Sequence, residues 1–248
     1  MTFPDDSVQG IVLDPKDRWW IGQTSQVPER GSLVHCYVPH VDQVPYRFEP
    51  TGRTNPTEHE KAEVRVTPLR VGAPLQPLQL PVAAMPSYAH EVWAAYRAKR
   101  RPCVVLSTAH PSVPRQLTAG KPNSATAKMM LVAPYFGVQS GLRAGYLPAF
   151  VQRVMHGYYP QFMVDWLPHP GGEQSILRLD QLQPAGCHHD AYQLLGFQLS
   201  PTAMGIMDNW IEWLLKGSIP ANCSLAAAID LLQSNDTAHR GSVAQDSP

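Results

Sequence analysis

Proline restricts the folding of this chain more than any other residue type. The chain has 248 residues and 25 prolines, and between Pro45 and Pro86 a proline recurs every few positions. Proline lacks a backbone N–H and has a fixed φ, which excludes it from the interior of a helix or a central strand. We therefore expect residues 42–86 to be a long polar insertion, with short extended pieces at 64–66 and 78–80.

Outside this segment, apolar runs of strand length are separated by turn residues. The order of elements shows no alternation of strands with helices, which favours a mainly antiparallel sheet over a parallel one. Short strands are expected at residues 11–13 and 19–21, and Trp19 and Trp20 are interpreted as core residues. The longer strands are predicted at residues 31–38, 103–107, 129–134, 161–167, 175–181 and 194–199.

The clearest helix follows the last of these strands. Ser200 is suited to the N-cap, Pro201 to the first turn and Gly217 to the C-terminal end. An apolar stripe at helical spacing completes the pattern: Met204, Met207, Trp210, Ile211, Leu214 and Leu215. Shorter helices are predicted at residues 88–100, 149–156 and 224–233, with residues 234–248 disordered.

The charge balance argues against one class of function. Lys plus Arg and Asp plus Glu both number 20, which gives a formal net charge of zero. A protein that holds nucleic acid by bulk electrostatics is normally basic. A local basic patch remains, at Arg97, Lys99, Arg100 and Arg101.

Cysteine usage and the N-terminus favour a reduced, cytoplasmic protein. Cys36 and Cys103 lie in apolar runs, where a reduced cysteine packs as a small core residue. The first residues are acidic and contain no apolar core of a signal peptide. No apolar run approaches the length of about 18–20 residues that spans a bilayer, so no membrane contact is expected.

The run Ser175-Ile176-Leu177-Arg178-Leu179-Asp180-Gln181 carries the main candidate for chemistry. Side chains of a strand alternate faces, which would put Arg178 and Asp180 side by side, with Leu177 and Leu179 opposite. A guanidinium beside a carboxylate on a rigid strand can bind a phosphate and move a proton. The same spacing also fits a plain salt bridge, and the sequence leaves both interpretations open.

Five segments, in order, resemble the MazF/PemK/Kid family of toxin endoribonucleases, which has the CcdB-like fold. Together they cover about half of the chain. They are Gly31-Ser32-Leu33-Val34-His35-Cys36, Arg101-Pro102-Cys103-Val104-Val105-Leu106-Ser107, Val132-Ala133-Pro134, Ile176-Leu177-Arg178-Leu179-Asp180-Gln181, and the strand and helix from Leu195 to Leu215.

The resemblance implies a fold and a division of the chain. The fold would be mainly β: a small curled antiparallel SH3-like barrel with a packed C-terminal helix and long loop insertions. The family-like domain would span 29–217, with insertions at 42–100 and 108–128. Residues 1–28 would be a lead-in, and 218–248 a partly disordered extension.

The resemblance also implies cleavage of single-stranded RNA without a metal or cofactor. The ribose 2′-oxygen attacks the adjacent phosphate, which calls for a base, an acid and positive charge. By analogy Asp180 would be the base, Arg178 the acid or charge stabiliser, and Arg101 a phosphate ligand. Because arginine does not give up its proton in proteins, we favour Arg178 as an electrostatic stabiliser.

The candidate RNA-binding residues are His40, Lys99, Arg100, Ser140 and Gln181. The chain departs from the family at one position. Where members carry Thr or Ser after a Val-Pro pair, this sequence has Tyr135-Phe136-Gly137, and the nearest hydroxyl beyond is that of Ser140.

The family further implies a homodimer and a cognate antitoxin protein as partner. Two other classes of function stay open: a catalytically inactive PemK-like module that binds nucleic acid or a protein, and a CcdB-like poison of a protein target. A zinc site at Cys187-His188-His189-Asp190 is disfavoured, because adjacent residues rarely converge on one metal and no second cluster has suitable spacing.

Overall fold

The chain divides into two units, Met1–Cys36 with Arg101–Pro248, and Tyr37–Arg100. The computed structural model describes residues 3–72, 82–86, 91–108, 111, 113–120, 126–138, 145–169, 174–220 and 223–243, with the side chains of the last helix described as far as Thr237.

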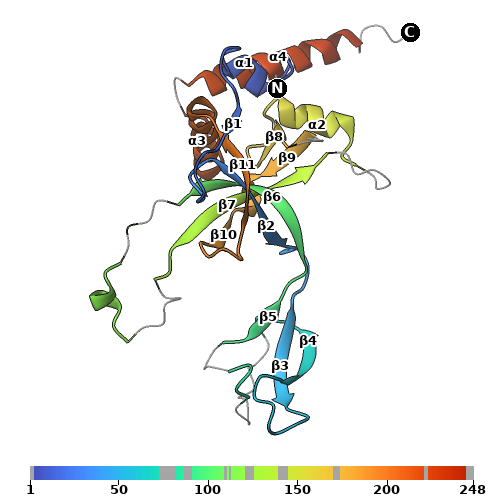
Figure 1. Ribbon diagram of the computed structural model, residues 1–248. Helices are drawn as coiled ribbons and strands as arrows, with labels where there is room; N and C mark the ends of the chain where they lie inside the picture. The colour runs from blue at the N-terminus through green and yellow to red at the C-terminus, as the bar shows by residue number, and fades with distance from the viewer. Residues whose placement is uncertain are drawn as a thin grey trace. The chain divides into compact units, whose positions relative to one another are not determined.

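The first unit is built on an eight-stranded sheet (Figure 1). The strand order is β1-β11-β2-β6-β7-β9-β8, with β10 paired to β7 off this path. The strands are β1 (Trp20–Gly22), β2 (Ser32–Pro39), β6 (Ala98–Ser107), β7 (Met129–Gly137), β8 (Phe162–Trp166), β9 (Gln174–Arg178), β10 (Gln183–Gly186) and β11 (Gln193–Leu199).

The expected mainly β fold with antiparallel strands and a C-terminal helix is confirmed. The pairs β1–β11, β11–β2, β6–β7, β7–β9, β8–β9 and β10–β7 are all antiparallel. Over the described residues this order is an open path rather than a closed barrel.

Most of the predicted strands are present, with two corrections. Residues 11–13 are not a strand, because α1 (Val8–Val12) begins there, capped by the Ser7 hydroxyl, which accepts from the Gly10 N–H. Strand β9 ends at Arg178, and Leu179–Gln181 is a short 3-10 turn, η3. Strand β10 was not predicted.

The second unit contains a three-stranded sheet in the order β4-β3-β5. Its strands are β3 (Tyr46–Gly52), β4 (Glu63–Pro68) and β5 (Trp93–Ala95). The prediction of a helix over 88–100 is therefore wrong: Trp93–Ala95 pairs with β3, and β6 begins at Ala98. The extended piece at 64–66 is confirmed as part of β4, whereas residues 78–80 lie outside the described residues.

The described residues of the predicted insertion, 42–72 and 82–86, contain more strand than expected, although β3 contains Pro50. Strand β5 pairs with β3 only from Tyr46 to Phe48, so among the described strands Pro50 has one partner, β4. A proline on a strand with a free side needs no N–H for a second neighbour. The pairing with β4 also becomes irregular between Pro50 and Gly52.

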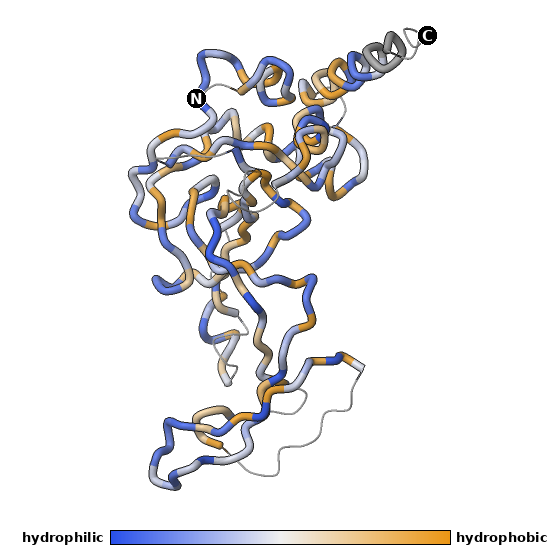
Figure 2. Tube along the Cα trace, turned by 90° about the vertical axis from the view of Figure 1, so that its right-hand side faces the viewer, coloured by the Kyte–Doolittle hydropathy of each residue, from blue (hydrophilic) through white to orange (hydrophobic). Residues whose placement is uncertain are grey.

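Two apolar clusters form the core of the first unit. Along the chain, hydrophobic residues are interspersed with hydrophilic ones (Figure 2). The larger packs the sheet against α1, α3 (Pro201–Lys216) and α4 (Ser224–Val243). The smaller packs α2 (Pro148–Met155) against the opposite faces of the strands. Helix α2 lies close to the predicted helix 149–156. The buried residues of this cluster are Val138, Val151, Val154, Val164 and Ile176.

Helix α3 is confirmed where the sequence placed it. The Ser200 hydroxyl accepts from the Ala203 N–H, and Gly217 ends the helix with φ 72°. Trp210 is fully buried, and its indole N–H donates to the Pro160 carbonyl at 3.0 Å. Leu215, expected on the buried stripe, is 73% exposed because the stripe ends before the last turn.

Helix α4 is longer than predicted and includes residues 234–243, which were expected to be disordered. A tertiary contact explains the difference. The Asp236 carboxylate lies 2.8 Å from Nδ1 of the buried His156 and accepts from the Tyr158 hydroxyl at 3.1 Å. This polar contact holds a part of the helix that has few apolar residues.

Among the described helices, none combines the length and the hydropathy needed to cross a bilayer.

A buried carboxylate joins three parts of the larger core. Asp165 on β8 is fully buried and accepts hydrogen bonds from the indoles of Trp19 at 3.1 Å and Trp20 at 3.2 Å, and from the Tyr135 hydroxyl at 2.8 Å. Burial raises the pKa of Asp165 to about 7, and the three hydrogen bonds oppose that rise. Trp19 and Trp20 are thus core residues, as predicted.

We expect Asp165 to make the unfolding free energy depend on pH. In the folded chain its pKa is about 7 against an ordinary value of 3.8, so between these values the folded state binds more protons than the unfolded state. Stability should then fall as the pH rises from about 4 to 7, by at most about 4 kcal/mol. Urea denaturation across this range measures the effect.

The matched comparison is Asp165→Asn, which has no titrating group at this position, beside the exposed Asp230→Asn. The unfolding free energy of the wild type minus that of Asp165→Asn should fall steadily as the pH rises from about 4 to 7, whereas the curve of Asp230→Asn should follow that of the wild type. Parallel curves for wild type and Asp165→Asn would contradict the prediction.

Candidate active site

The site residues lie on one face of four neighbouring strands. The pairings Cys103↔Pro134 and Phe136↔Ile176 fix β6, β7 and β9 in register, and Arg178 on β9 lies opposite Phe162 on β8. Because strand side chains alternate, Arg101 on β6 shares the face of Phe136. This is the face that carries the smaller apolar cluster, since Phe162 packs against it.

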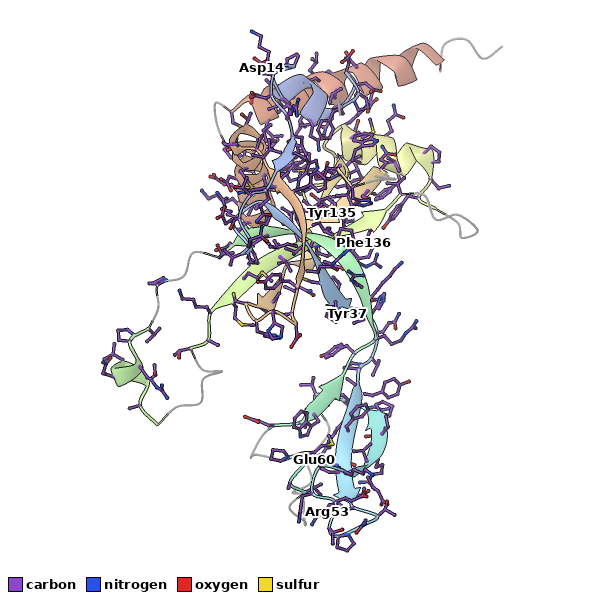
Figure 3. All side chains as sticks on the ribbon, in the orientation of Figure 1. Asp14, Tyr37, Arg53, Glu60, Tyr135 and Phe136 are labelled. Carbon is purple, nitrogen blue, oxygen red and sulfur yellow. The ribbon has the colours of Figure 1, made fainter. Side chains whose placement is uncertain are left out.

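Aromatic rings support both guanidinium groups. The Arg101 Cζ lies 3.7 Å from the centroid of the Phe136 ring. The Arg178 Cζ lies 5.4 Å from the same ring and 5.0 Å from that of Phe162. Figure 3 labels Phe136 and its neighbour Tyr135 on β7. A guanidinium on an aromatic face keeps its in-plane N–H groups available for a ligand.

Arg178 and Asp180 form a two-point ion pair. The Arg178 Nε donates to one carboxylate oxygen of Asp180 and a terminal nitrogen donates to the other, both at 2.7 Å. The two side chains are 22% and 36% exposed. The predicted closeness is confirmed, but its cause is the η3 turn rather than strand alternation: Leu179 is buried within that turn and presents Asp180 beside the end of β9.

The electrostatics differ between the two arginines. Burial lowers the pKa of Arg101, and the Arg178 guanidinium lowers it further. The hydrogen bond to Asp180 raises the pKa of Arg178 above its ordinary value, and contact with Tyr146 raises it further. Because arginine stays protonated in proteins, Arg101, Arg178 and Asp180 together carry one net positive charge.

Tyr146 was not singled out from the sequence. Its backbone N–H donates to the Val138 carbonyl at 3.3 Å, which returns the chain to the end of β7. Its ring lies 5.2 Å from the ring of Phe150 on α2, and it is 36% exposed. Nothing in the sequence spacing marks it, because eight residues separate it from the end of β7.

The predicted RNA-binding residues lie in different parts of the chain, and only one of them lies beside Asp180. Gln181 lies on the η3 turn beside Asp180 and is half-buried. His40, Lys99 and Arg100 belong to the second unit, whose position relative to this site is not determined. Ser140 lies outside the described residues.

Over the part of the chain that the structure describes, no group of three or more His, Cys, Asp or Glu side chains is arranged to hold a metal ion. Cys187 is exposed, and His189 pairs with Asp190 at 3.3 Å on the surface.

Comparison with known proteins assigns no family. No protein-family model matches the sequence, and no curated protein matches it significantly. The function must therefore be argued from the residues of the site.

We expect the Arg178–Asp180 pair to contribute little to stability. Both side chains are partly exposed, and the measured coupling of such pairs is about 1 kcal/mol or less. A double-mutant cycle with Arg178→Ala and Asp180→Ala, followed by urea denaturation, measures this coupling. The surface pair Lys216–Glu212 is the reference. A coupling well above that of the reference would identify the pair as a structural ion pair instead.

Proposed function

We propose that this chain is a metal-independent endoribonuclease of the MazF/PemK/Kid type, which cleaves single-stranded RNA and acts as the toxin of a toxin–antitoxin system. One observation carries the proposal: the carboxylate of Asp180 and the guanidinium groups of Arg178 and Arg101 gather on one sheet face. These groups supply the base and the positive charge that this cleavage needs.

The proposed reaction uses these groups in one step. Asp180 accepts the proton of the ribose 2′-hydroxyl as the 2′-oxygen attacks the adjacent phosphorus. Arg178 and Arg101 stabilise the extra negative charge on the phosphoryl oxygens. The bond from phosphorus to the 5′-oxygen breaks, which yields a 2′,3′-cyclic phosphate and a free 5′-hydroxyl end.

The sheet order supports the family assignment. The five segments that resemble the family fall on β2, β6, β7, β9 with η3, and β11 with α3. These strands are contiguous in the order β11-β2-β6-β7-β9. We propose that they correspond to the SH3-like, CcdB-type barrel of the family and that the remaining segments are additions to it.

The proposal predicts cleavage of a long single-stranded RNA in EDTA, with cyclic-phosphate ends. Loss of the base in Asp180→Asn should slow cleavage by about 10²–10⁴-fold. Loss of a charge stabiliser in Arg178→Ala should slow it by about 10²–10³-fold. Gel analysis of end-labelled RNA measures both, with circular dichroism to show that each variant is folded.

The control is Glu212→Gln, which removes a surface carboxylate that pairs with Lys216 on α3. It should cleave like the wild type. A folded wild type that does not cut RNA, or cuts as well after Asp180→Asn, would contradict the assignment.

A second candidate function is favoured by the ion pair itself. Both oxygens of Asp180 accept from Arg178, so the base is occupied unless a ligand competes for the guanidinium. A catalytically inactive module that binds nucleic acid through Arg101 and Arg178 fits this arrangement. It would bind RNA without cutting it, so the same cleavage assay separates the two functions.

We further propose a homodimer and an antitoxin partner, as the resemblance implies. Light scattering at micromolar concentration should give about twice the mass of 27.4 kDa for the free chain. A monomer under these conditions would count against the dimer.

A further inference from the structure

The proposed reaction lacks a proton donor for the leaving 5′-oxygen. Arginine is a poor acid because its guanidinium does not give up a proton in proteins. The hydroxyl expected after β7's Pro134 is also missing. Tyr135 stands there, but it is buried and its hydroxyl donates to Asp165 at 2.8 Å. Phe136, which follows, has no hydroxyl.

Tyr146 brings a hydroxyl to this site from the chain that follows β7. Its ring packs on that of Phe150, which in turn packs on Phe162, the ring 5.0 Å from the Arg178 Cζ. The phenol acts on both guanidinium groups, since it raises the pKa of Arg178 and opposes the lowering of the pKa of Arg101. Because arginine has only donors, the phenol oxygen can face them as an acceptor while its O–H is donated to a ligand. The Val138 carbonyl and the Phe150 ring fix the residue at its backbone and its side chain.

We propose that Tyr146 is the general acid of this site and donates its proton to the 5′-oxygen of the leaving nucleotide. This role rests on the proposed ribonuclease function. As Asp180 takes the 2′-hydroxyl proton and the P–O5′ bond breaks, the phenol proton passes to the 5′-oxygen. The phenolate then recovers a proton from water. The charge it carries meanwhile lies beside the guanidinium groups of Arg101 and Arg178.

Other tyrosines near this cluster are engaged elsewhere. The Tyr158 hydroxyl donates its proton to Asp236 at 3.1 Å. The Tyr159 hydroxyl accepts from Arg153 at 3.5 Å and thus contacts a guanidinium other than those of Arg101 and Arg178. Tyr146 is also 36% exposed, so an RNA phosphate can approach its hydroxyl.

The test uses two RNAs with one cleavable linkage each, identical except that the 5′-bridging oxygen is sulfur in the second. A thiolate leaves without a proton, so loss of the acid matters only for the oxygen substrate. Tyr146→Phe keeps the ring on Phe150 and should slow cleavage of the oxygen substrate by about 10²-fold or more. Its cleavage of the sulfur substrate should stay within a few-fold of the wild type.

Two variants complete the design. Asp180→Asn should slow cleavage of both substrates, because the base activates the same 2′-hydroxyl whether oxygen or sulfur leaves. Tyr159→Phe, which removes a hydroxyl from the same aromatic cluster, should leave both rates near those of the wild type.

The outcomes separate the inference from the function on which it rests. Equal losses on both substrates in Tyr146→Phe, or no loss on either, would overturn the role of Tyr146 while the ribonuclease function stands. A folded wild type that cleaves neither RNA would overturn the ribonuclease function itself, and the role of Tyr146 with it.

Discussion

The buried carboxylate of Asp165 is the interaction on which the rest of the first unit depends. Its three donors come from the β1 edge and from β7. One side chain of β8, at one end of the sheet order, therefore holds β1 at the other end and the interior strand β7. Because consecutive residues of a strand face opposite sides, holding Tyr135 on the core side also fixes Phe136 on the other. The ring that supports Arg101 is thus positioned from inside the core (Figure 3).

The same interaction accounts for Tyr135 at the position where the MazF/PemK/Kid family, which the sequence resembles, carries Thr or Ser. The hydroxyl of Tyr135 donates a hydrogen bond to Asp165 in the core. Without this donor, the buried carboxylate would lose a hydrogen-bond partner in an apolar interior. In the proposed mechanism, the hydroxyl that acts on the leaving group therefore comes from another segment. The return of the chain at Tyr146, through its backbone bond to the Val138 carbonyl, places one at the end of the same strand.

The sequence was sufficient to predict the elements whose signals are local. The strands at 31–38 and 129–134 and the capped helix after Ser200 have apolar periodicity and bounded ends, and all three are present. The failures have tertiary causes. β5 is a strand because β3 pairs with it, and the polar second half of α4 is helical because Asp236 contacts His156 and Tyr158. At the site, the sequence spacing was sufficient to find Arg178 and Asp180. Tyr146 could not be found in this way, because its position depends on a tertiary hydrogen bond to the Val138 carbonyl.

The charge balance of the site limits what can bind there. Arg101, Arg178 and Asp180 sum to one positive charge, and a phosphodiester carries one negative charge. Partial burial of both arginines leaves less water to screen them, so an anion that approaches the sheet face gains from both. To contact Arg178 fully it must displace a carboxylate oxygen of Asp180. That displacement would free the oxygen to accept a proton. In the proposed mechanism, binding of the phosphate therefore also releases the base.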